Sequence, residues 1–158
     1  MTNDIQPRRS VLYMPGSNAR ALEKAKTLAA DALILDLEDA VAPDTKAMAR
    51  QQVVNAVNNG GYEPREVAIR INGRGSQWHA DDLDAVAASK AAALVLPKAE
   101  GAGQVRAVAA ALPKHMDLWC MIETPLAILH AEEIAAASPK TRCLIMGTSD
   151  LATDLNAL

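Results

Sequence analysis

The stretch that decides the fold is Leu33-Ile-Leu-Asp-Leu-Glu-Asp-Ala-Val41, a short apolar run that ends in three carboxylates. A run of Leu and Ile bounded in this way predicts a strand buried on both faces, as in a parallel sheet. Because side chains alternate along a strand, Asp36 and Glu38 are expected on one face and Leu35 and Leu37 on the other. For this stretch alone, a strand followed by an acidic surface loop would be the simpler interpretation. The same layout recurs, however, at the ends of later strands.

Six strands are predicted, over residues 10–14, 33–36, 66–71, 93–96, 117–122 and 142–146, and each is followed by a helical segment. This alternation predicts parallel strands joined by right-handed helical crossovers. An open doubly wound sheet and a (β/α)8 barrel both fit. The barrel is favoured because polar and charged residues follow nearly every strand, whereas an open sheet would gather its ligand groups at one switch point.

The fold class is therefore predicted to be α/β, of the (β/α)8 TIM-barrel type. A closed barrel typically takes roughly 250 residues, and this chain has 158. We therefore expect residues 1–158 to form a single, incomplete barrel domain with a catalytic role.

The composition gives no reason to expect nucleic acid or a membrane as a binding partner. Half of the residues are hydrophobic, the net charge is −3, and no basic block stands out, so nothing in the sequence argues for nucleic-acid binding. No signal peptide and no apolar run of membrane-spanning length is visible, so no membrane partner is expected. Cys120 and Cys143 fall in predicted strands and are expected to be reduced core residues of a cytoplasmic protein.

Charged and polar side chains lie at the ends of the predicted strands in turn. They are Asp36, Glu38 and Asp39 at the end of the second strand, Arg70 and Asn72 at the third, Lys98 and Glu100 at the fourth, Glu123 at the fifth and Asp150 at the sixth. Glu123 and Asp150 follow neighbouring strands and could share one cation. Oxygen ligands without His or Cys suit Mg²⁺. The alternative for each acid by itself is a helix N-cap, since each precedes a helix.

Arg70 is the best candidate for binding a substrate carboxylate or a developing oxyanion, because its guanidinium presents a rigid fork of donors. Its alternative role is an ion pair with Asp36 or Glu38, and both roles can hold if the acids orient the arginine. Lys98 could be a Schiff-base lysine, but we favour a solvated or ion-paired side chain.

The segment from Tyr13 through Gly16 to Arg20 is a turn followed by a helix start, and such a helix start can hold a phosphate group. Arg20 would then supply positive charge. An ordinary surface helix is the alternative interpretation.

Six motifs together resemble a known family. They are Arg9-Ser-Val-Leu-Tyr-Met-Pro-Gly-Ser-Asn18, Leu35-Asp-Leu-Glu-Asp-Ala-Val41, Val67-Ala-Ile-Arg-Ile-Asn72, Leu96-Pro-Lys-Ala-Glu100, Met121-Ile-Glu-Thr124 and Gly147-Thr-Ser-Asp-Leu-Ala152. In this order they look like the motifs of the citrate lyase β-subunit-like family, within the HpcH/HpaI aldolase superfamily. The resemblance covers almost the whole chain.

The resemblance implies a Mg²⁺-dependent barrel that acts on a CoA-thioester substrate, as a homo-oligomer (trimer or hexamer). By this resemblance Glu123 and Asp150 match the family's metal ligands, and Arg70 matches its substrate-binding arginine. The acids Asp36, Glu38 and Asp39 match a supporting polar shell beside the catalytic centre. The segment containing Tyr13, Gly16 and Arg20 lies near the CoA-binding rim, and Lys98 is a further candidate for substrate contact.

The resulting hypothesis is a reversible carbon–carbon lyase. It would cleave a 3-hydroxyacyl-CoA thioester, such as citryl-CoA, malyl-CoA or citramalyl-CoA, into an acyl-CoA and a 2-oxo acid or glyoxylate. The general base is not assigned. Two alternatives remain open: a CoA-independent 2-oxo acid aldolase, and a non-catalytic subunit that binds an acyl-CoA or an acyl carrier protein.

The resemblance also implies a barrel that continues past the position equivalent to Leu158. Made alone, the chain is expected to associate, to aggregate, or to belong to a longer polypeptide, because its outermost strands would present unpaired backbone groups.

Overall fold

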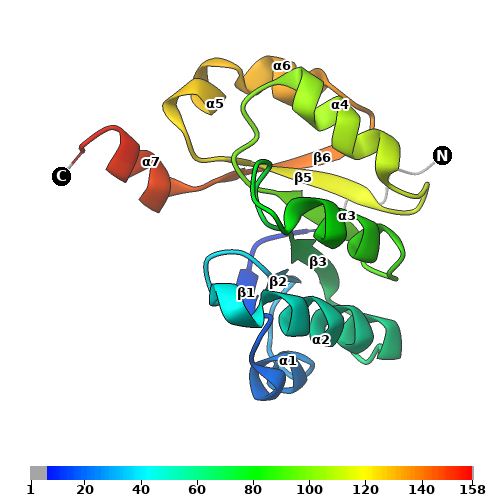
Figure 1. The fold of residues 1–158 in the computed structure, drawn as a ribbon. Helices are drawn as coiled ribbons and strands as arrows, with labels where there is room; N and C mark the ends of the chain where they lie inside the picture. The colour runs from blue at the N-terminus through cyan, green and yellow to red at the C-terminus, as the bar shows by residue number, and fades with distance from the viewer. Residues whose placement is uncertain (1–6, 158) are drawn as a thin grey trace.

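The computed structural model describes residues 7–157, which form one parallel sheet covered by helices (Figure 1). The strands are β1 (Val11–Pro15), β2 (Ala32–Asp36), β3 (Glu66–Arg70), β4 (Ala93–Leu96), β5 (Asp117–Ile122) and β6 (Thr141–Met146). All six lie where the sequence predicts them. Every pair of neighbours is parallel, with β2 register running from Ala32 opposite Glu66 to Asp36 opposite Arg70.

The helices are α1 (Ala19–Ala25), a short 3₁₀ turn η1 (Pro43–Thr45), α2 (Lys46–Asn59), α3 (His79–Ala87), α4 (Ala102–Ala111), α5 (Pro125–Leu129), α6 (Ala131–Ala136) and α7 (Thr148–Asp154). The single helix predicted after the fifth strand was wrong in one respect, because it is divided at His130. That residue leaves helical geometry at φ −101° and ψ 10°. Its Nδ1 lies 2.7 Å from the carbonyl oxygen of Glu100, which ties the break to the loop after β4.

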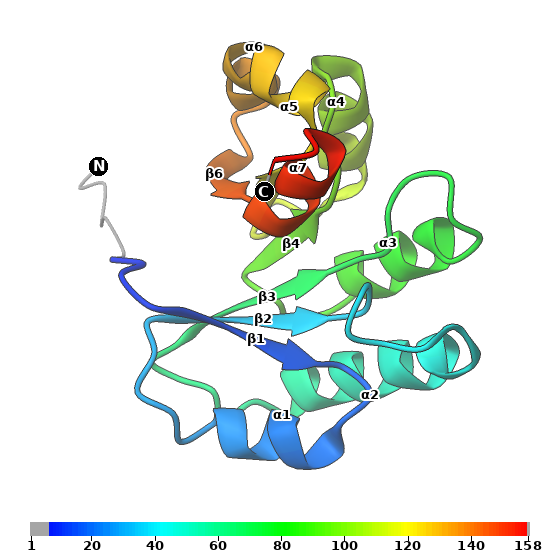
Figure 2. The same ribbon diagram turned by 90° about the vertical axis from the view of Figure 1, so that its left-hand side faces the viewer.

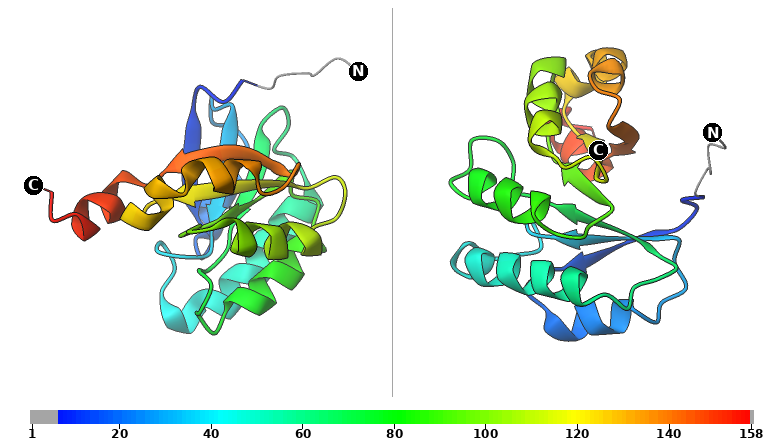
Figure 3. Two further views of the ribbon diagram at one scale, coloured as in Figure 1. Left: turned by 90° about the horizontal axis from the view of Figure 1, so that it is seen from above. Right: turned by 90° about the vertical axis from the view of Figure 1, so that its right-hand side faces the viewer.

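The strand order decides between the two architectures. Each strand pairs with the next one in the chain, in the order β1 to β6, so the sheet has no switch point of the doubly wound kind. Figure 2 shows the sheet curving from β3 through β4 to β6, and Figure 3 shows the same curvature from two other sides. This is the barrel-type arrangement that the sequence predicts. Within residues 7–157, β1 and β6 form the two edges and do not pair with each other.

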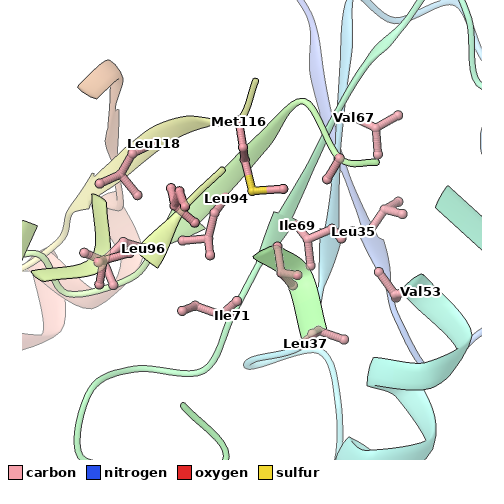
Figure 4. Packing of buried hydrophobic residues seen from close by; sticks show 14 of the residues in the cluster. Leu35, Leu37, Val53, Val67, Ile69, Ile71, Leu94, Leu96, Met116 and Leu118 are labelled. Carbon is pink, nitrogen blue, oxygen red and sulfur yellow. The ribbon is translucent and has the colours of Figure 1, made fainter. Parts of the chain in front are cut away.

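The two faces of the sheet carry different rows of side chains. Leu35, Ile69, Leu94 and Leu118 point to the helical layer, where they pack against residues such as Val53 of α2 (Figure 4). Alternate residues form a second cluster on the opposite, inner face; they are Ala32, Ile34, Ala68, Ala93, Val95, Trp119 and Met121. The predicted alternation along the second strand is therefore confirmed.

The inner face also positions the functional side chains. Asp36, Arg70 and Glu123 each lie two residues after an inner-face residue, namely Ile34, Ala68 and Met121. Because a strand repeats every two residues, the three charged side chains emerge on this same face at the carboxyl ends of their strands.

Cys120 and Cys143 are both free thiols. Cys120 is buried as expected, and burial raises the pKa of its thiol to about 12, whereas Cys143, on the edge strand β6, is only partly buried. Within the described residues, no helix is both long enough and apolar enough to cross a membrane.

Candidate active site at the carboxyl ends of the strands

The centre of the site is a buried ion pair between Arg70 and Asp36. The guanidinium Nε and Nη2 donate to the two carboxylate oxygens of Asp36 at 2.6 and 2.7 Å, which is the two-pronged geometry specific to arginine. The side chains are only 9% and 1% exposed. Burial opposes the charge of Arg70, but the hydrogen bonds and charge of Asp36 outweigh it and raise the arginine's pKa.

The third nitrogen of Arg70, Nη1, meets two further acids at longer distances. It lies 3.2 Å from Oε2 of Glu38 and 3.3 Å from Oδ2 of Asp39. The ring of Tyr13 stacks near the guanidinium, with its centroid 5.2 Å from the Cζ atom. Burial raises the pKa of Glu38 to about 7, although the positive charge of Arg70 acts in the opposite direction.

Asp36 also shapes the backbone that follows β2. Its Oδ1 accepts a hydrogen bond from the backbone N–H of Glu38 at 2.9 Å, and its Oδ2 accepts one from Ala40 at 3.0 Å. The alternative interpretation of Asp36 as a helix N-cap is wrong, because its partners lie in the turn and the N-cap positions of η1 and α2 are Ala42 and Thr45. We call residues 36–40 the acidic turn. The carboxylate of Asp36 both closes this turn and orients Arg70.

The carboxyl ends of the strands surround an opening, which we call the mouth. Glu123 lies directly after β5, on the side of the mouth away from β2, and is 3% exposed. Its Oε1 accepts a hydrogen bond from the backbone N–H of Lys98 at 2.7 Å, and Lys98 adopts a left-handed conformation with φ 47°. Burial is the main cause that raises the pKa of Glu123, and the nearby charge of Asp150 adds to it. The N-cap of α5 is the side chain of Thr124, which accepts from Ala127, so Glu123 is not the capping residue.

Asp150 lies in the first turn of α7, which begins after β6. Its Oδ2 is 3.3 Å from Nζ of Lys98, in a pair whose side chains are 42% and 51% exposed. A pocket of about 340 Å³ brings the two sides of the mouth together. It is lined by Tyr13, Asp39, Arg70, Met121, Glu123, Ile145, Met146, Gly147, Thr148, Ser149 and Asp150.

Gly147 leaves room for the Glu123 carboxylate. A Cβ atom at this position would lie 2.5 Å from the Cβ and 2.7 Å from Oε2 of Glu123. Any larger residue would therefore push the carboxylate out of its place. In the sequence this residue is a glycine directly after the predicted sixth strand, and only the folded chain shows which contact requires it.

Glu123 and Asp150 offer donor atoms that suit a hard divalent cation. One oxygen of Glu123 is held by the Lys98 N–H, and its other oxygen faces the gap that Gly147 leaves. In the described part of the chain, no group of three or more His, Cys, Asp and Glu side chains is placed to hold a metal ion. Two carboxylates, with water or substrate oxygens at the other positions, are a usual environment for Mg²⁺. The residues present therefore fit this ion.

Gly16 and Arg20, which the family resemblance places near the CoA-binding rim, do not line this pocket. Gly16 is buried, its N–H donates to the carbonyl of Asp36 at 2.8 Å, and an added Cβ would lie 2.5 Å from that oxygen. Its evident role is this close approach of two chain segments. Arg20 is exposed on α1. Contact of either residue with CoA stays a prediction.

A larger hollow of about 610 Å³ lies between α1 and α2, where Leu22, Met48 and Gln52 are among the lining residues. It lacks the paired acids and the buried arginine of the mouth. The chemistry of the residues, rather than the size of the hollow, therefore assigns the candidate site.

The sequence interpretation missed several supporting groups. Lys46 and Asp82 are charged but almost fully buried, at 6% and 1% exposure. Lys46 donates to backbone carbonyls of the acidic turn, and Asp82 accepts hydrogen bonds from Asn72. His79 of α3 also contacts this region, since its Nδ1 lies 2.9 Å from the carbonyl oxygen of Asn72. Nothing in a single helical sequence distinguishes such residues from ordinary surface charges.

A sequential parallel sheet with acids and an arginine at its carboxyl ends defines a barrel-type α/β protein, a class whose binding sites generally lie at the carboxyl ends of the strands. The family is also clear. The chain belongs to the HpcH/HpaI aldolase/citrate lyase family, whose model matches residues 9–158.

Two groups of relatives are informative. A (3S)-malyl-CoA thioesterase from Cereibacter sphaeroides is 47% identical over 157 residues, covering 99% of this chain and 54% of the relative. An L-malyl-CoA/beta-methylmalyl-CoA lyase from the same species is 35% identical, covering 95% of this chain and 51% of the relative. The chain thus spans about half the length of the curated relatives it matches.

Solved structures agree with the fold. The citrate lyase beta subunit of M. tuberculosis, complexed with oxaloacetate and magnesium, has a TM-score of 0.79 and 34% identity, covering 96% of this chain and 64% of that one. A second structure from that organism, of the protein CitE with magnesium, acetoacetate and coenzyme A, has a TM-score of 0.77 and 35% identity. This comparison covers 96% of the chain and 54% of the neighbour.

Proposed function

We propose that the mouth of this sheet belongs to a Mg²⁺-dependent carbon–carbon lyase that acts on a 3-hydroxyacyl-CoA thioester. The observation that carries the proposal is the buried Arg70–Asp36 pair, which faces Glu123 and Asp150 across one pocket. The names of the relatives, which include malyl-CoA and beta-methylmalyl-CoA, support a thioester of a short hydroxy acid.

In this proposal Glu123 and Asp150 hold the ion, which supplies polarisation of the substrate's hydroxyl and carboxylate oxygens when bound. Arg70 binds negative charge on the substrate. Its Nη1 is the nitrogen best placed for this, since its contacts with Glu38 and Asp39 are longer than the pair of bonds that hold Nε and Nη2. Asp36 keeps the guanidinium plane fixed, so little reorganisation is needed as charge develops.

The reaction is a retro-Claisen cleavage. The substrate hydroxyl loses its proton, the adjacent carbon–carbon bond breaks, and its electron pair passes to the thioester as an enolate, which then takes up a proton on carbon. The products are an acyl-CoA and a 2-oxo acid or glyoxylate. Burial raises the pKa of Glu38 to about 7, so this carboxyl is matched to holding or releasing a proton near neutral pH. The general base that takes the hydroxyl proton is left unassigned.

A second candidate is hydrolysis of the thioester, favoured by the 47% identity to a relative named (3S)-malyl-CoA thioesterase. The two activities leave different products. Cleavage of malyl-CoA gives glyoxylate and acetyl-CoA without free thiol, whereas hydrolysis gives malate and free CoA thiol.

The test is therefore to incubate the protein and Mg²⁺ with malyl-CoA and to measure glyoxylate and free thiol in parallel. Glyoxylate without an equal amount of thiol supports the lyase, and thiol alone supports the hydrolase. Turnover of pyruvate with an aldehyde but not of thioesters would identify a CoA-independent aldolase instead. Thioester binding without either product would identify a non-catalytic subunit.

We further propose a cytoplasmic homo-oligomer. The free thiols of Cys120 and Cys143 support a reducing compartment. Exposed apolar side chains on α5, such as Leu126 at 45% and Leu129 at 80%, support association between chains. Light scattering at several protein concentrations tests this part of the proposal.

A further inference from the structure

A buried polar cluster lies behind the acidic turn, outside the residues that line the pocket. At its centre is the backbone carbonyl of Leu37, the residue between Asp36 and Glu38. This oxygen accepts two hydrogen bonds, from Nζ of Lys46 at 3.0 Å and from Nδ2 of Asn72 at 2.9 Å.

Lys46 also donates to the carbonyl oxygen of Glu38, at 2.9 Å. Its ammonium group therefore spans two successive carbonyls of the acidic turn. Its Nζ lies 5.0 Å from the ring centroid of Trp78, and the residue is 6% exposed. Burial of an ammonium group is costly unless it is fully bonded, so the cluster holds Lys46 in one place.

Asn72 is held in turn by Asp82 of α3. Oδ2 of Asp82 accepts from the backbone N–H of Asn72 at 2.9 Å and from its side-chain amide at 2.6 Å. Oδ1 of Asp82 accepts from Nε of Arg50 at 2.7 Å, which compensates the buried negative charge. The cluster thus ties α2 and α3 to the ends of β2 and β3.

We propose that Lys46 and Asn72 are positioning residues for the active site. They fix the two peptide units of the acidic turn, which set the directions of Asp36 and Glu38. Through those acids they fix Arg70. Neither residue touches the pocket, so their contribution is to geometry rather than to substrate binding.

An alternative is that the cluster only stabilises the fold, and the chain offers a matched control for it. Lys140 makes the same kind of contact far from the mouth, where its Nζ donates to the carbonyl oxygens of Pro113 and Met116. Lys46→Met and Lys140→Met both remove an ammonium group that bridges two backbone carbonyls. Only the first of them lies behind the acidic turn.

The kinetic readout rests on the proposed function. We expect kcat for thioester cleavage to fall roughly 10–100-fold in Lys46→Met, the usual effect of losing a group that orients an active-site residue. Lys140→Met should stay within about twofold of the wild type, and Lys46→Arg should recover part of the loss because it keeps charged donors. Equal kcat values in folded Lys46→Met and Lys140→Met would overturn the proposal. If circular dichroism shows that Lys46→Met is unfolded, Lys46→Gln replaces it in the same comparison.

A second readout needs no turnover. In ¹⁵N nuclear magnetic resonance spectra, the Nε–H of Arg70 reports its hydrogen bond to Asp36. We expect this signal to shift in Lys46→Met and to stay in place in Lys140→Met. An unchanged signal in Lys46→Met would refute the positioning role, whereas a shifted signal in a protein without lyase activity would refute only the proposed reaction.

Discussion

The two sides of the mouth hold their charges in different ways. Around β2 and β3, Arg70 and Asp36 are 9% and 1% exposed and share two short hydrogen bonds. Around β4 and β6, Lys98 and Asp150 are 51% and 42% exposed and share one contact of 3.3 Å. Glu123, next to that pair, has one oxygen held by a backbone N–H.

We call the β2–β3 side, with Arg70 and Asp36, the prebuilt side of the site. We call the β4–β6 side, with Lys98, Glu123 and Asp150, the open side. A buried two-pronged ion pair keeps its geometry whether or not a ligand is present, since breaking it leaves a charge without compensation. A half-exposed lysine–carboxylate pair contributes little and can be exchanged for a stronger interaction. We infer that the β2–β3 side orients the substrate, and that the β4–β6 side rearranges when a cation binds.

The largest effect is expected from breaking the prebuilt side. Asp36→Asn keeps the size of the side chain but leaves Arg70 buried without its main counter-charge. We expect a loss of about 3–5 kcal/mol in the free energy of unfolding, the usual cost of removing one partner of a buried ion pair. Urea denaturation measures it.

The control for this change is Asp81→Asn. Asp81 also pairs with an arginine, Arg50, but its side chain is 71% exposed. An exposed pair of this kind is expected to contribute about 0–1 kcal/mol. Equal losses in the two variants would show that burial of the Arg70–Asp36 pair is not what makes it strong.

The next effect concerns turnover on the prebuilt side. Arg70→Lys keeps the positive charge but cannot reproduce the two-pronged contact with Asp36 or a directed donor at the Nη1 position. We expect a loss of about 2–4 kcal/mol of transition-state stabilisation, the range for one preorganised donor. This is measured as kcat/KM for thioester cleavage. Wild-type kcat/KM in Arg70→Lys would mean that the arginine serves the fold alone.

The open side is tested with Glu123→Gln. The amide can still accept the Lys98 N–H, but it lacks the charge that a hard cation requires. Mg²⁺ affinity measured by calorimetry should fall by more than the roughly 10–100-fold that loss of an outer hydrogen-bond partner costs. The free energy of unfolding should change little, because burial already disfavours the charged form of Glu123. Glu132→Gln, on the exposed surface of α6, is the control. Unchanged Mg²⁺ affinity in Glu123→Gln would remove this residue from the metal site.

Much of the fold could be predicted from the sequence because strands and helices alternate with clear apolar runs. The division at His130 could not, since it depends on a contact with the Glu100 carbonyl from a distant loop. Strand order was predictable only through the spread of polar residues over all strand ends. The absence of a switch point in the sheet then confirmed the barrel-type arrangement.

The candidate site was predictable where residues lie at the carboxyl ends of strands, as Arg70 and Glu123 do. The acids of the second strand were expected to support the arginine, and Asp36 does so at hydrogen-bond distance. The buried partners on helices were not predictable. Lys46 looks like any helical lysine until the chain folds and places its ammonium group on the carbonyls of Leu37 and Glu38.

The smallest effect is a pH dependence within the prebuilt side. Burial raises the pKa of Glu38 from 4.5 to about 7, so the folded chain keeps a proton that the unfolded chain has already lost between these values. Stability from this group is therefore present in acid and declines as the pH rises through that range, because the folded state there binds more protons than the unfolded state. In chelator-treated protein, the wild type should lose stability relative to Glu38→Gln between about pH 5 and about pH 8, since the amide cannot ionise. A difference that stays constant across this range would show that Glu38 titrates normally, and that Arg70 compensates its charge as fully as it does that of Asp36.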